Sequence, residues 1–382
     1  MILQTQSQLD DICATLSKKP YLTIDTEFLR DKTYYSKLCL VQLAAKDIDP
    51  VAIDPISTDL DWTPFYELMQ NEKVIKVFHA ARQDLEIFFQ ESGKIPHPIF
   101  DTQVAAMVCG YGESIAYARL VDDLTNGQIA KNAQFTDWSK RPLSEKQLTY
   151  ALNDVTYLRD VYEILSKRLK KQDRLHWVEQ EMEILTDPET YIMLPEEAWQ
   201  RVKIRSDKPQ VLAILQKLAE WRETMAISKN LPRGHIIKDD ALANIALYQP
   251  KDKNAMSRIR GVPANITKGK HGPVIFDLIH SALNSPKDKW PKPKKNIPFP
   301  NELSPALEML KLLLKINSSQ NEVAAKLIAN AKDLEKIALD NHEDVLCMKG
   351  WRFEIFGKDA LALKEGKISL GLKDNKINKF KV

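Results

Sequence analysis

Four acidic residues and one tyrosine constrain the fold of this chain most strongly, because they lie in three short segments of the first 154 residues. They are Asp25 and Glu27 in YLTIDTEFLR, Asp84 in KVFHAARQDLEIFF, and Tyr150 with Asp154 in QLTYALNDVTYL. Carboxylates that converge in a fold repel each other and resist desolvation, so they need cations to stay ionised. Hard oxygen ligands suit Mg²⁺ or Mn²⁺, and two such ions roughly 3.5–4 Å apart can clamp a phosphodiester during cleavage. The pattern therefore indicates metal-dependent phosphoryl transfer to water.

The first two segments combine strand and helix signals. YLTID is rich in β-forming residues, and residues 38–44, LCLVQLA, read as a second strand after a turn. Residues two apart on a strand point to the same side, so Asp25 and Glu27 share a face while Thr26 points away. Asp84 follows the apolar strand KVIKVFHA and lies near the start of the helical segment DLEIFFQ.

The third segment predicts a helix with a defined start. Ser144 is a suitable N-cap, and Gln147 three positions later completes a capping box. Tyr150 and Asp154 are four residues apart, so they lie on one face of this helix. A lone Asp-x-Glu on a strand, or a lone Tyr-x-x-x-Asp on a helix, is usually part of an ordinary surface. Only the joint occurrence of all three segments indicates a site.

Together these segments resemble the exonuclease motifs of the DEDD superfamily, in its tyrosine-bearing subgroup. DTEFLRDKTYYSKLCLVQLA and HAARQDLEIF are similar to the ribonuclease D family, and the resemblance covers nearly the full chain. It implies that Asp25, Glu27, Asp84 and Asp154 bind two divalent ions, and that Tyr150 orients or deprotonates the attacking water. A phenol has an ordinary pKa of about 10, so we expect Tyr150 to position the water first and act as a base second.

Other polar and aromatic residues near the motifs are candidates for substrate binding. We expect Thr26, Phe28, Gln42 and His79 to contact substrate, with Phe28 wedged against the terminal base. Gln42 either contacts substrate or packs in the core. His79 has no Cys or His partner at a spacing that suits zinc, so we expect it to line a pocket near the substrate and not to bind zinc. Asp101 is better explained as a helix cap than as a fifth metal ligand.

Composition places the chain among ordinary globular proteins. With 382 residues and 44% apolar residues, we expect two or three domains. No stretch approaches the roughly 20 apolar residues of a membrane span, and the N-terminus lacks the features of a secretory signal. The four cysteines show no zinc or disulfide spacing, so a reduced cytoplasmic location is expected.

The net charge of +3 conceals an asymmetry. Residues 1–180 contain 21 Lys and Arg against 26 Asp and Glu, whereas the remainder contains 34 against 26. An acidic catalytic half joined to a basic half suits an enzyme that binds a polyanion away from its metal site. Ordinary variation in surface charge explains the counts equally well.

The chain divides into an α/β part and helical parts. Alternating strand and helix signals predict an α/β domain first, and the family resemblance implies the ribonuclease H-like exonuclease fold. Two small all-α helical bundles follow, both HRDC-like, the second diverged; the lysine-rich tail KDNKINKFKV is expected to fray. The predicted parts are an exonuclease domain (1–170), a connecting helical segment (171–206), an HRDC domain (207–285), a Pro- and Lys-rich linker (286–300) and the second helical domain (301–375).

The HRDC resemblance rests on Leu218, Trp221, Arg222, Ala226, Pro232, Ile245 and Pro250. It implies nucleic-acid binding, and the exposed basic candidates for phosphate contacts are Lys229, Arg233, Lys238, Lys251, Lys253, Arg258 and Arg260. Residues 125–140 lack clear periodicity, which predicts a loop at the mouth of the active site.

The resemblance therefore predicts a 3′→5′ exoribonuclease that trims structured RNAs and releases nucleoside 5′-monophosphates. It implies tRNA precursors as substrates, whose single-stranded 3′ end enters the acidic site, and no obligate protein partner is evident. Three alternatives remain: a DNA exonuclease of the same superfamily, a polymerase-associated proofreading exonuclease, which is the less favoured, and a catalytically inactive RNA-binding scaffold. Contacts to the ribose 2′-hydroxyl separate RNA from DNA enzymes, and the sequence does not reveal them.

Overall fold

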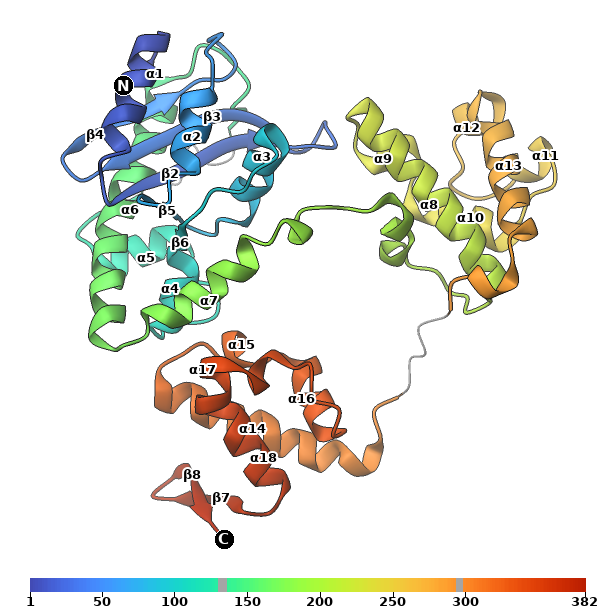
Figure 1. Ribbon diagram of the computed structural model, residues 1–382. Coiled ribbons are helices and arrows are strands. Elements are labelled where there is room, and N and C mark those ends of the chain that lie inside the picture. Colours follow the sequence, from blue (N-terminus) through green and yellow to red (C-terminus); the bar gives the residue numbers. More distant parts are fainter. Residues whose placement is uncertain (130–135, 293–297) are drawn as a thin grey trace. The chain divides into compact units, whose positions relative to one another are not determined.

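The computed structural model describes residues 1–129, 136–292 and 298–382, which form two compact units (Figure 1). The first unit comprises Met1–Glu27, Cys39–Thr190 and Ile297–Val382, and the second comprises Phe28–Leu38 and Tyr191–Asn296. Parts of the predicted loop at 125–140 and of the predicted linker at 286–300 lie outside the described residues.

A six-stranded sheet forms the centre of the exonuclease part. Its strands run in the order β1-β4-β3-β2-β5-β6, in which β1 is parallel to β4, β3 is antiparallel to β4, and β2, β5 and β6 are parallel. β3 is buried along almost its whole length, as expected for a central strand covered on both faces. The strands are β1 (Ile2–Leu3), β2 (Tyr21–Leu29), β3 (Lys37–Ala45), β4 (Ile48–Ile53), β5 (Ile75–Phe78) and β6 (Ile99–Asp101).

Helices join and cover these strands, and their starts follow local sequence signals. The predicted capping box of Ser144 and Gln147 is confirmed at the start of the longest helix, α6. Asp101 is confirmed as the N-cap of α4, because its carboxylate accepts a hydrogen bond from the Gln103 amide. The helices are α1 (Gln6–Leu16), α2 (Thr63–Met69), α3 (Arg82–Ser92), α4 (Thr102–Val108), α5 (Tyr117–Leu124), α6 (Glu145–Lys171) and α7 (Leu175–Leu185).

The second unit is a helical bundle built around one long helix, α8. The apolar face of α8 packs against α10 and α13, and its core includes Leu215, Leu218 and Ile245. The helices are α8 (Pro209–Lys229), α9 (Arg233–Ile236), α10 (Asp239–Tyr248), α11 (Lys253–Ser257), α12 (Ala264–Lys268) and α13 (His271–Asn284). Five short 3₁₀ segments also occur in the described chain: η1 (Pro188–Thr190), η2 (Pro195–Arg201), η3 (Lys287–Lys289), η4 (Asn301–Leu303) and η5 (Leu346–Met348).

One predicted phosphate contact in this bundle, Arg233, also has an intramolecular partner. The Arg233 guanidinium donates two hydrogen bonds of 2.6 Å to Glu223, whose side chain is fully buried. The Tyr34 hydroxyl donates to the same carboxylate. A buried carboxylate needs such compensation, so Arg233 serves the fold of this unit.

The C-terminal part of the first unit is helical and ends in a β-hairpin. The prediction of a frayed tail was wrong, because Lys376–Lys381 pairs along its length with Ile368–Lys373. The helices are α14 (Ser304–Asn321), α15 (Ala325–Ile328), α16 (Ala331–Ala338), α17 (Gly350–Arg352) and α18 (Lys358–Lys364), with the π-helical turn η6 (Phe353–Gly357) between the last two; the strands are β7 (Ile368–Lys373) and β8 (Lys376–Lys381).

Contacts with α7 attach this helical part to the exonuclease part. The rings of Trp177 and Trp351 stack with centroids 4.5 Å apart, and the Arg352 guanidinium donates to the Glu181 carboxylate. All four cysteines are buried and free. Within the described residues, no helix combines the length and apolar character needed to cross a membrane.

Candidate active site

Three of the predicted acidic residues converge at the end of β2. Asp25 and Glu27 lie on one face of this strand, and Asp154 lies on α6. One carboxylate oxygen from each lies within 4.8 Å of the other two. Alternation along the strand and the helical spacing of α6 therefore produce a compact acidic cluster from residues about 130 positions apart.

The fourth acid, Asp84, lies in the first turn of α3 and is buried. Its carboxylate accepts a hydrogen bond from the Thr26 hydroxyl, which comes from the opposite face of β2 to Asp25 and Glu27. Burial and then the negative charge of Asp25 raise the pKa of Asp84 well above its ordinary value. Asp84 therefore lies beside β2, the strand that carries Asp25 and Glu27, and interacts electrostatically with the acidic cluster.

Asp101 stabilises the turn between β5 and α3, which precedes Asp84. The Asp101 carboxylate accepts hydrogen bonds from the backbone amides of Ala80 and Ala81, at 2.9 and 2.8 Å. Ala80 has a positive φ of 59°, a conformation that costs energy for a residue with a Cβ. The helix cap of α4 thus also stabilises the strained turn between β5 and α3.

Proximity and burial make the cluster resist ionisation. Burial raises the pKa of Asp25 to about 6, and burial with the charges of Asp25 and Asp154 raises that of Glu27 to about 10. Burial and the charge of Asp25 raise the pKa of Asp154 to about 8. A divalent cation would remove this penalty by neutralising the charges.

The donor set fits a hard divalent cation. Its oxygens are carboxylates, which are preferred by Mg²⁺ and Mn²⁺. One oxygen of Asp154 is buried without a hydrogen-bond partner in the described structure, as expected of an atom reserved for a ligand. These residues can therefore hold the divalent ions that the sequence resemblance implies.

Tyr150 precedes Asp154 by one helical turn and is half-buried. Burial first, and then the charges of Asp154, Glu27 and Asp25, raise the pKa of its hydroxyl above the ordinary range. The Tyr150 hydroxyl consequently keeps its proton at neutral pH. Its ring centroid lies 6.2 Å from that of Trp138, which is buried.

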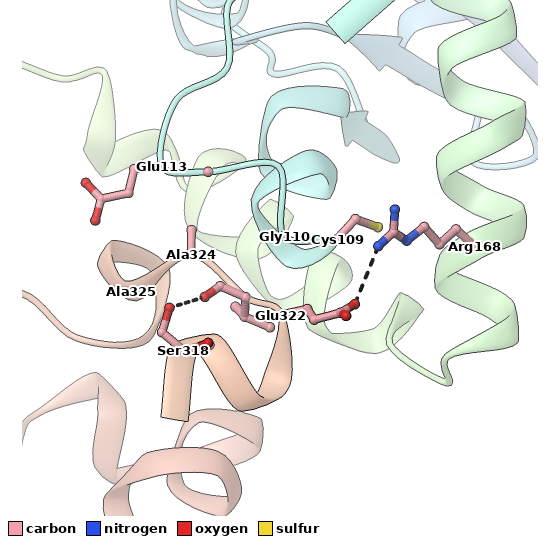
Figure 2. A pocket seen from close by; sticks show the side chains of 11 residues that line it. Cys109, Gly110, Glu113, Arg168, Ser318, Glu322, Ala324 and Ala325 are labelled. Carbon is pink, nitrogen blue, oxygen red and sulfur yellow. Dashed lines mark hydrogen bonds and ion pairs between the residues drawn. The ribbon is translucent and has the colours of Figure 1, made fainter. Parts of the chain in front are cut away.

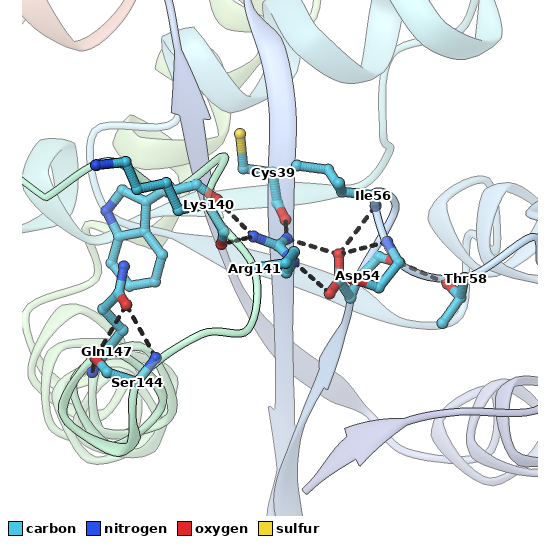
Figure 3. A network of polar contacts seen from close by, with 10 residues as sticks. Cys39, Asp54, Ile56, Thr58, Lys140, Arg141, Ser144 and Gln147 are labelled. Carbon is cyan, nitrogen blue, oxygen red and sulfur yellow. Dashed lines mark hydrogen bonds and ion pairs between the residues drawn. The ribbon is translucent and has the colours of Figure 1, made fainter.

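A half-buried arginine, Arg141, clamps the segment that carries Trp138 (Figure 3). The Arg141 guanidinium donates to both oxygens of Asp54, at 2.6 Å each, and to the Cys39 carbonyl on β3 at 2.7 Å. It also donates to the carbonyl oxygens of Trp138 and Lys140 within its own segment. The clamp therefore fixes this segment against the sheet just before α6 begins.

Tyr117 contacts the residues of the candidate site, and the sequence analysis missed it. Its hydroxyl donates to the backbone carbonyl of Asp154, and its ring centroid lies 4.9 Å from the His79 ring. His79 is half-buried and contacts the Thr102 hydroxyl through Nδ1, at 3.0 Å. Burial lowers the pKa of His79, so its ring is neutral near pH 7. Tyr117 lies 33 residues before Tyr150 and outside all three motif segments, so no local sequence signal identified it.

The remaining predicted substrate contacts have different surroundings. Gln42 is fully buried on β3, and its side-chain amide has no hydrogen-bond partner among the described residues. Phe28 is half-buried and directly follows Glu27 on β2. Their roles toward substrate, like those of Thr26 and His79, stay predictions.

A pocket of about 530 Å³ lies elsewhere in the first unit, between the end of α4 and the helices α14 and α15 (Figure 2). Its polar groups largely satisfy one another: Arg168 pairs with Glu322 at 3.6 Å, and the Ser318 hydroxyl donates to the Val323 carbonyl at 2.6 Å. Its lining, taken over the described residues, contains none of the predicted site residues. It is separate from the acidic site.

Comparisons with known proteins agree with this geometry. Residues 1–170 match the 3′-5′ exonuclease family, and residues 211–279 match the HRDC domain. Ribonuclease D of Bartonella henselae is 47% identical over 99% of this chain and 93% of its own length, and that of Nitrobacter hamburgensis is 46% identical over 98% of each. The crystal structure of Escherichia coli ribonuclease D, described as an exoribonuclease involved in structured RNA processing, is similar with a TM-score of 0.84 and 26% identity, over 96% of this chain and 98% of that one.

Proposed function

The chain belongs to the ribonuclease D family of 3′→5′ exoribonucleases, and from this premise we propose that its acidic cluster is the hydrolytic centre. The observation that carries the proposal is the approach of the Asp25, Glu27 and Asp154 carboxylates to within 4.8 Å of one another. Asp84 completes the acidic set through its electrostatic coupling to Asp25. The family is metal-dependent, and the proposed ions are two Mg²⁺ or Mn²⁺.

The bound ions would polarise the scissile phosphate and make the attacking water more acidic. The protonated Tyr150 hydroxyl would hold that water in line with the phosphorus atom. Thr26 would fix the orientation of Asp84 through its hydrogen bond, and Tyr117 would fix α6 at Asp154. Hydrolysis at the terminal linkage releases a nucleoside 5′-monophosphate.

Substrate contacts would come from residues around the cluster. We propose that Phe28 wedges against the terminal base and that the unpaired amide of Gln42 binds the substrate. Neutral His79 would line the same site. RNA is the proposed substrate, because the relatives are ribonucleases D and the E. coli protein is described as acting in structured RNA processing. Within that class we propose tRNA precursors, acted on in the cytoplasm.

The helical parts would hold the body of the RNA. The HRDC domain is one, and we propose that residues 301–375 form a second, diverged HRDC-like domain. The order of helices supports this proposal. Each of the two helical parts has a long helix, then a one-turn helix, then a helix of medium length: α8, α9 and α10 in the first, and α14, α15 and α16 in the second. The first helix of each set ends at a left-handed residue, Asn230 or Glu322. The predicted domain boundaries remain part of this proposal.

The test compares a labelled structured RNA carrying a single-stranded 3′ tail with its DNA counterpart. We expect a ladder that shortens from the 3′ end of RNA, requires Mg²⁺ or Mn²⁺, and is lost in Asp25→Asn. Asp49→Asn is the matched control, because Asp49 lies on β4 outside the acidic cluster. Equal trimming of DNA would contradict RNA selectivity, and RNA binding without trimming by the wild-type protein would contradict the hydrolytic centre.

A further inference from the structure

The C-terminal β-hairpin has no role in the acidic site, and its construction is specific. Strands β7 and β8 pair in register from Ile368 with Lys381 to Lys373 with Lys376. The two-residue turn between them is formed by Asp374 and Asn375, whose φ angles are 54° and 59°. Two consecutive positive φ values match the tight turn that suits the twist of paired strands, so the hairpin is locally encoded.

The two faces of the hairpin differ, because side chains alternate along each strand. One face carries Ile368, Leu370, Leu372, Ile377, Lys379 and Lys381. Lys379 anchors this face to the helical part: its ammonium group donates to Asp359 on α18 at 2.6 Å and to Asn317 on α14 at 2.9 Å. The opposite face carries Ser369, Gly371, Lys373, Lys376, Asn378 and Phe380.

An aromatic ring lies on a glycine on this second face. A Cβ at Gly371 would come within 3.1 Å of a ring carbon of Phe380, so the absence of a side chain lets the ring pack onto the strand. Phe380 nevertheless remains 38% exposed. The ring is therefore held in place and still presents surface to solvent.

Two lysines lie on the same face at the turn. Lys373 and Lys376 are directly paired across the strands, and both are exposed. Like charges in this position destabilise a hairpin. Neither has an ion-pair partner among the residues that the structure describes. Their pairing is therefore unfavourable for folding alone and becomes favourable when a polyanion binds.

We propose that this face, defined by Lys373, Lys376, Gly371 and Phe380, binds a single-stranded segment of RNA. The two lysines contact successive phosphates, and a base stacks on the exposed part of the Phe380 ring. Small polar neighbours, Ser369 and Asn378, leave room for the backbone to approach. The inference rests on RNA being the substrate, and it assigns a second contact remote in sequence from the acidic cluster.

Binding is measured in the Asp25→Asn background with chelator, so that the RNA stays intact. The probe is a fluorescent single-stranded oligoadenylate titrated at several salt concentrations. We expect Lys373→Glu/Lys376→Glu to weaken binding and to lower the slope of log affinity against log salt by about 1.4, the contribution of two phosphate contacts. Lys332→Glu/Lys336→Glu is the matched control, because these exposed lysines on α16 give the same charge change within the same helical part.

The aromatic contact is tested separately. Phe380→Leu keeps an apolar side chain on Gly371 but removes the stacking surface, and we expect about 5-fold weaker binding or more. Phe380→Trp retains a stacking ring, and its affinity should be near that of the wild type. Unchanged affinity in both Phe380→Leu and the lysine variant would overturn the proposal, as would an equal loss in the α16 control.

Turnover separates this proposal from the hydrolytic centre. With Asp25 intact, the lysine variant should trim a trinucleotide as fast as the wild type while its KM for long RNA rises. An unchanged KM for long RNA would overturn the hairpin proposal and leave the hydrolytic centre standing. If the wild type itself trimmed neither RNA, the hydrolytic centre would fail, while the binding titration would still decide the hairpin proposal.

Discussion

At the scale of single residues, Glu27 carries a large electrostatic cost in the acidic cluster. The pKa of Glu27 is raised to about 10, whereas the pKa of a glutamate in an unfolded chain is about 4.3. A group whose pKa is higher in the folded state contributes full stability below its unfolded pKa, and that stability is lost as the pH rises through the folded value. Without metal, the protein should therefore become less stable between about pH 5 and about pH 9.

Glu27→Gln should remove part of this pH dependence. In chelator at about pH 8, we expect the variant to be more stable than the wild type by about 1 kcal/mol, or about 2–4 °C in Tm. Mg²⁺ or Mn²⁺ should raise the Tm of the wild type more than that of the variant, because the variant has lost a ligand. Thermal melts with and without metal measure both effects, and a lower Tm for the variant in chelator would contradict the prediction.

The hydroxyl of Tyr150 should act on turnover and leave metal binding intact. We expect Tyr150→Phe to lower kcat by about 100-fold or more, the range typical for one group that positions or transfers a proton. The rise in Tm with Mg²⁺ should be preserved, because the phenol is not among the clustered carboxylates. Tyr157→Phe, on the same helix, is the control; equal losses in both variants would show a general effect on α6.

The sequence allowed part of this site to be predicted, for physical reasons. Strand alternation relates Asp25 to Glu27, and helical spacing relates Tyr150 to Asp154, so local periodicity identified them. Tyr117 could not be identified in this way, since α5 packs against α6 and the Tyr117 hydroxyl donates to a backbone carbonyl, that of Asp154. The coupling of Thr26 to Asp84 is likewise a tertiary contact between two elements.

At the scale of elements, strands and capped helices were predictable where one local rule decided the structure. The buried run of β3 and the capping box of α6 are examples. The C-terminal hairpin was not predicted, because its lysine-rich composition favours solvated coil. The turn residues Asp374 and Asn375 were a sequence signal for a hairpin, but the lysine-rich composition was given more weight.

The Arg141 clamp is an element-scale device, because it joins the segment before α6 to β3 and to Asp54 after β4. Burial opposes ionisation of Asp54, yet hydrogen bonds from Arg141, Ile56 and Ser57 together with the Arg141 charge outweigh burial and lower the pKa of that carboxyl. Arg141→Met should cost about 3 kcal/mol of unfolding free energy by leaving Asp54 buried and unpaired. Asp54→Asn combined with Arg141→Met should cost less than the sum of the single changes in urea titrations.

Arg141→Lys should separate geometry from charge. A lysine ammonium keeps the charge but cannot reproduce the forked contacts to Asp54 and Cys39. We expect intermediate stability and a lower kcat than the wild type, because Trp138 then supports Tyr150 less firmly. A kcat equal to that of the wild type would limit the clamp to a purely structural role.

At the scale of the whole molecule, the first unit joins two parts of the chain that are distant in sequence. The attachment includes the stacked Trp177 and Trp351 rings and the buried ion pair of Arg352 with Glu181. Arg352 also donates to the Leu327 carbonyl at 2.8 Å, so it connects α7 to α15. These contacts show why the C-terminal helices belong to the same compact unit as the sheet.

This ion pair gives a prediction with a defined pH dependence. Burial raises the pKa of Glu181, and the Arg352 charge opposes that rise. Arg352→Met should raise the pKa further, so the loss of stability should be small near about pH 5, where Glu181 can take up a proton, and larger near about pH 8. At the higher pH we expect a loss of about 3 kcal/mol in denaturant titrations, as for other buried charges that lose their partner.

The double variant Glu181→Gln/Arg352→Met is the control, because a neutral amide has no proton to exchange. Its loss of stability should be nearly the same at both pH values. Equal losses for Arg352→Met at both pH values would instead mean that packing against Trp351 and the bond to Leu327 dominate the attachment. Because the variant acts on the attachment and not on the acidic cluster, trinucleotide turnover at the lower pH should stay close to that of the wild type.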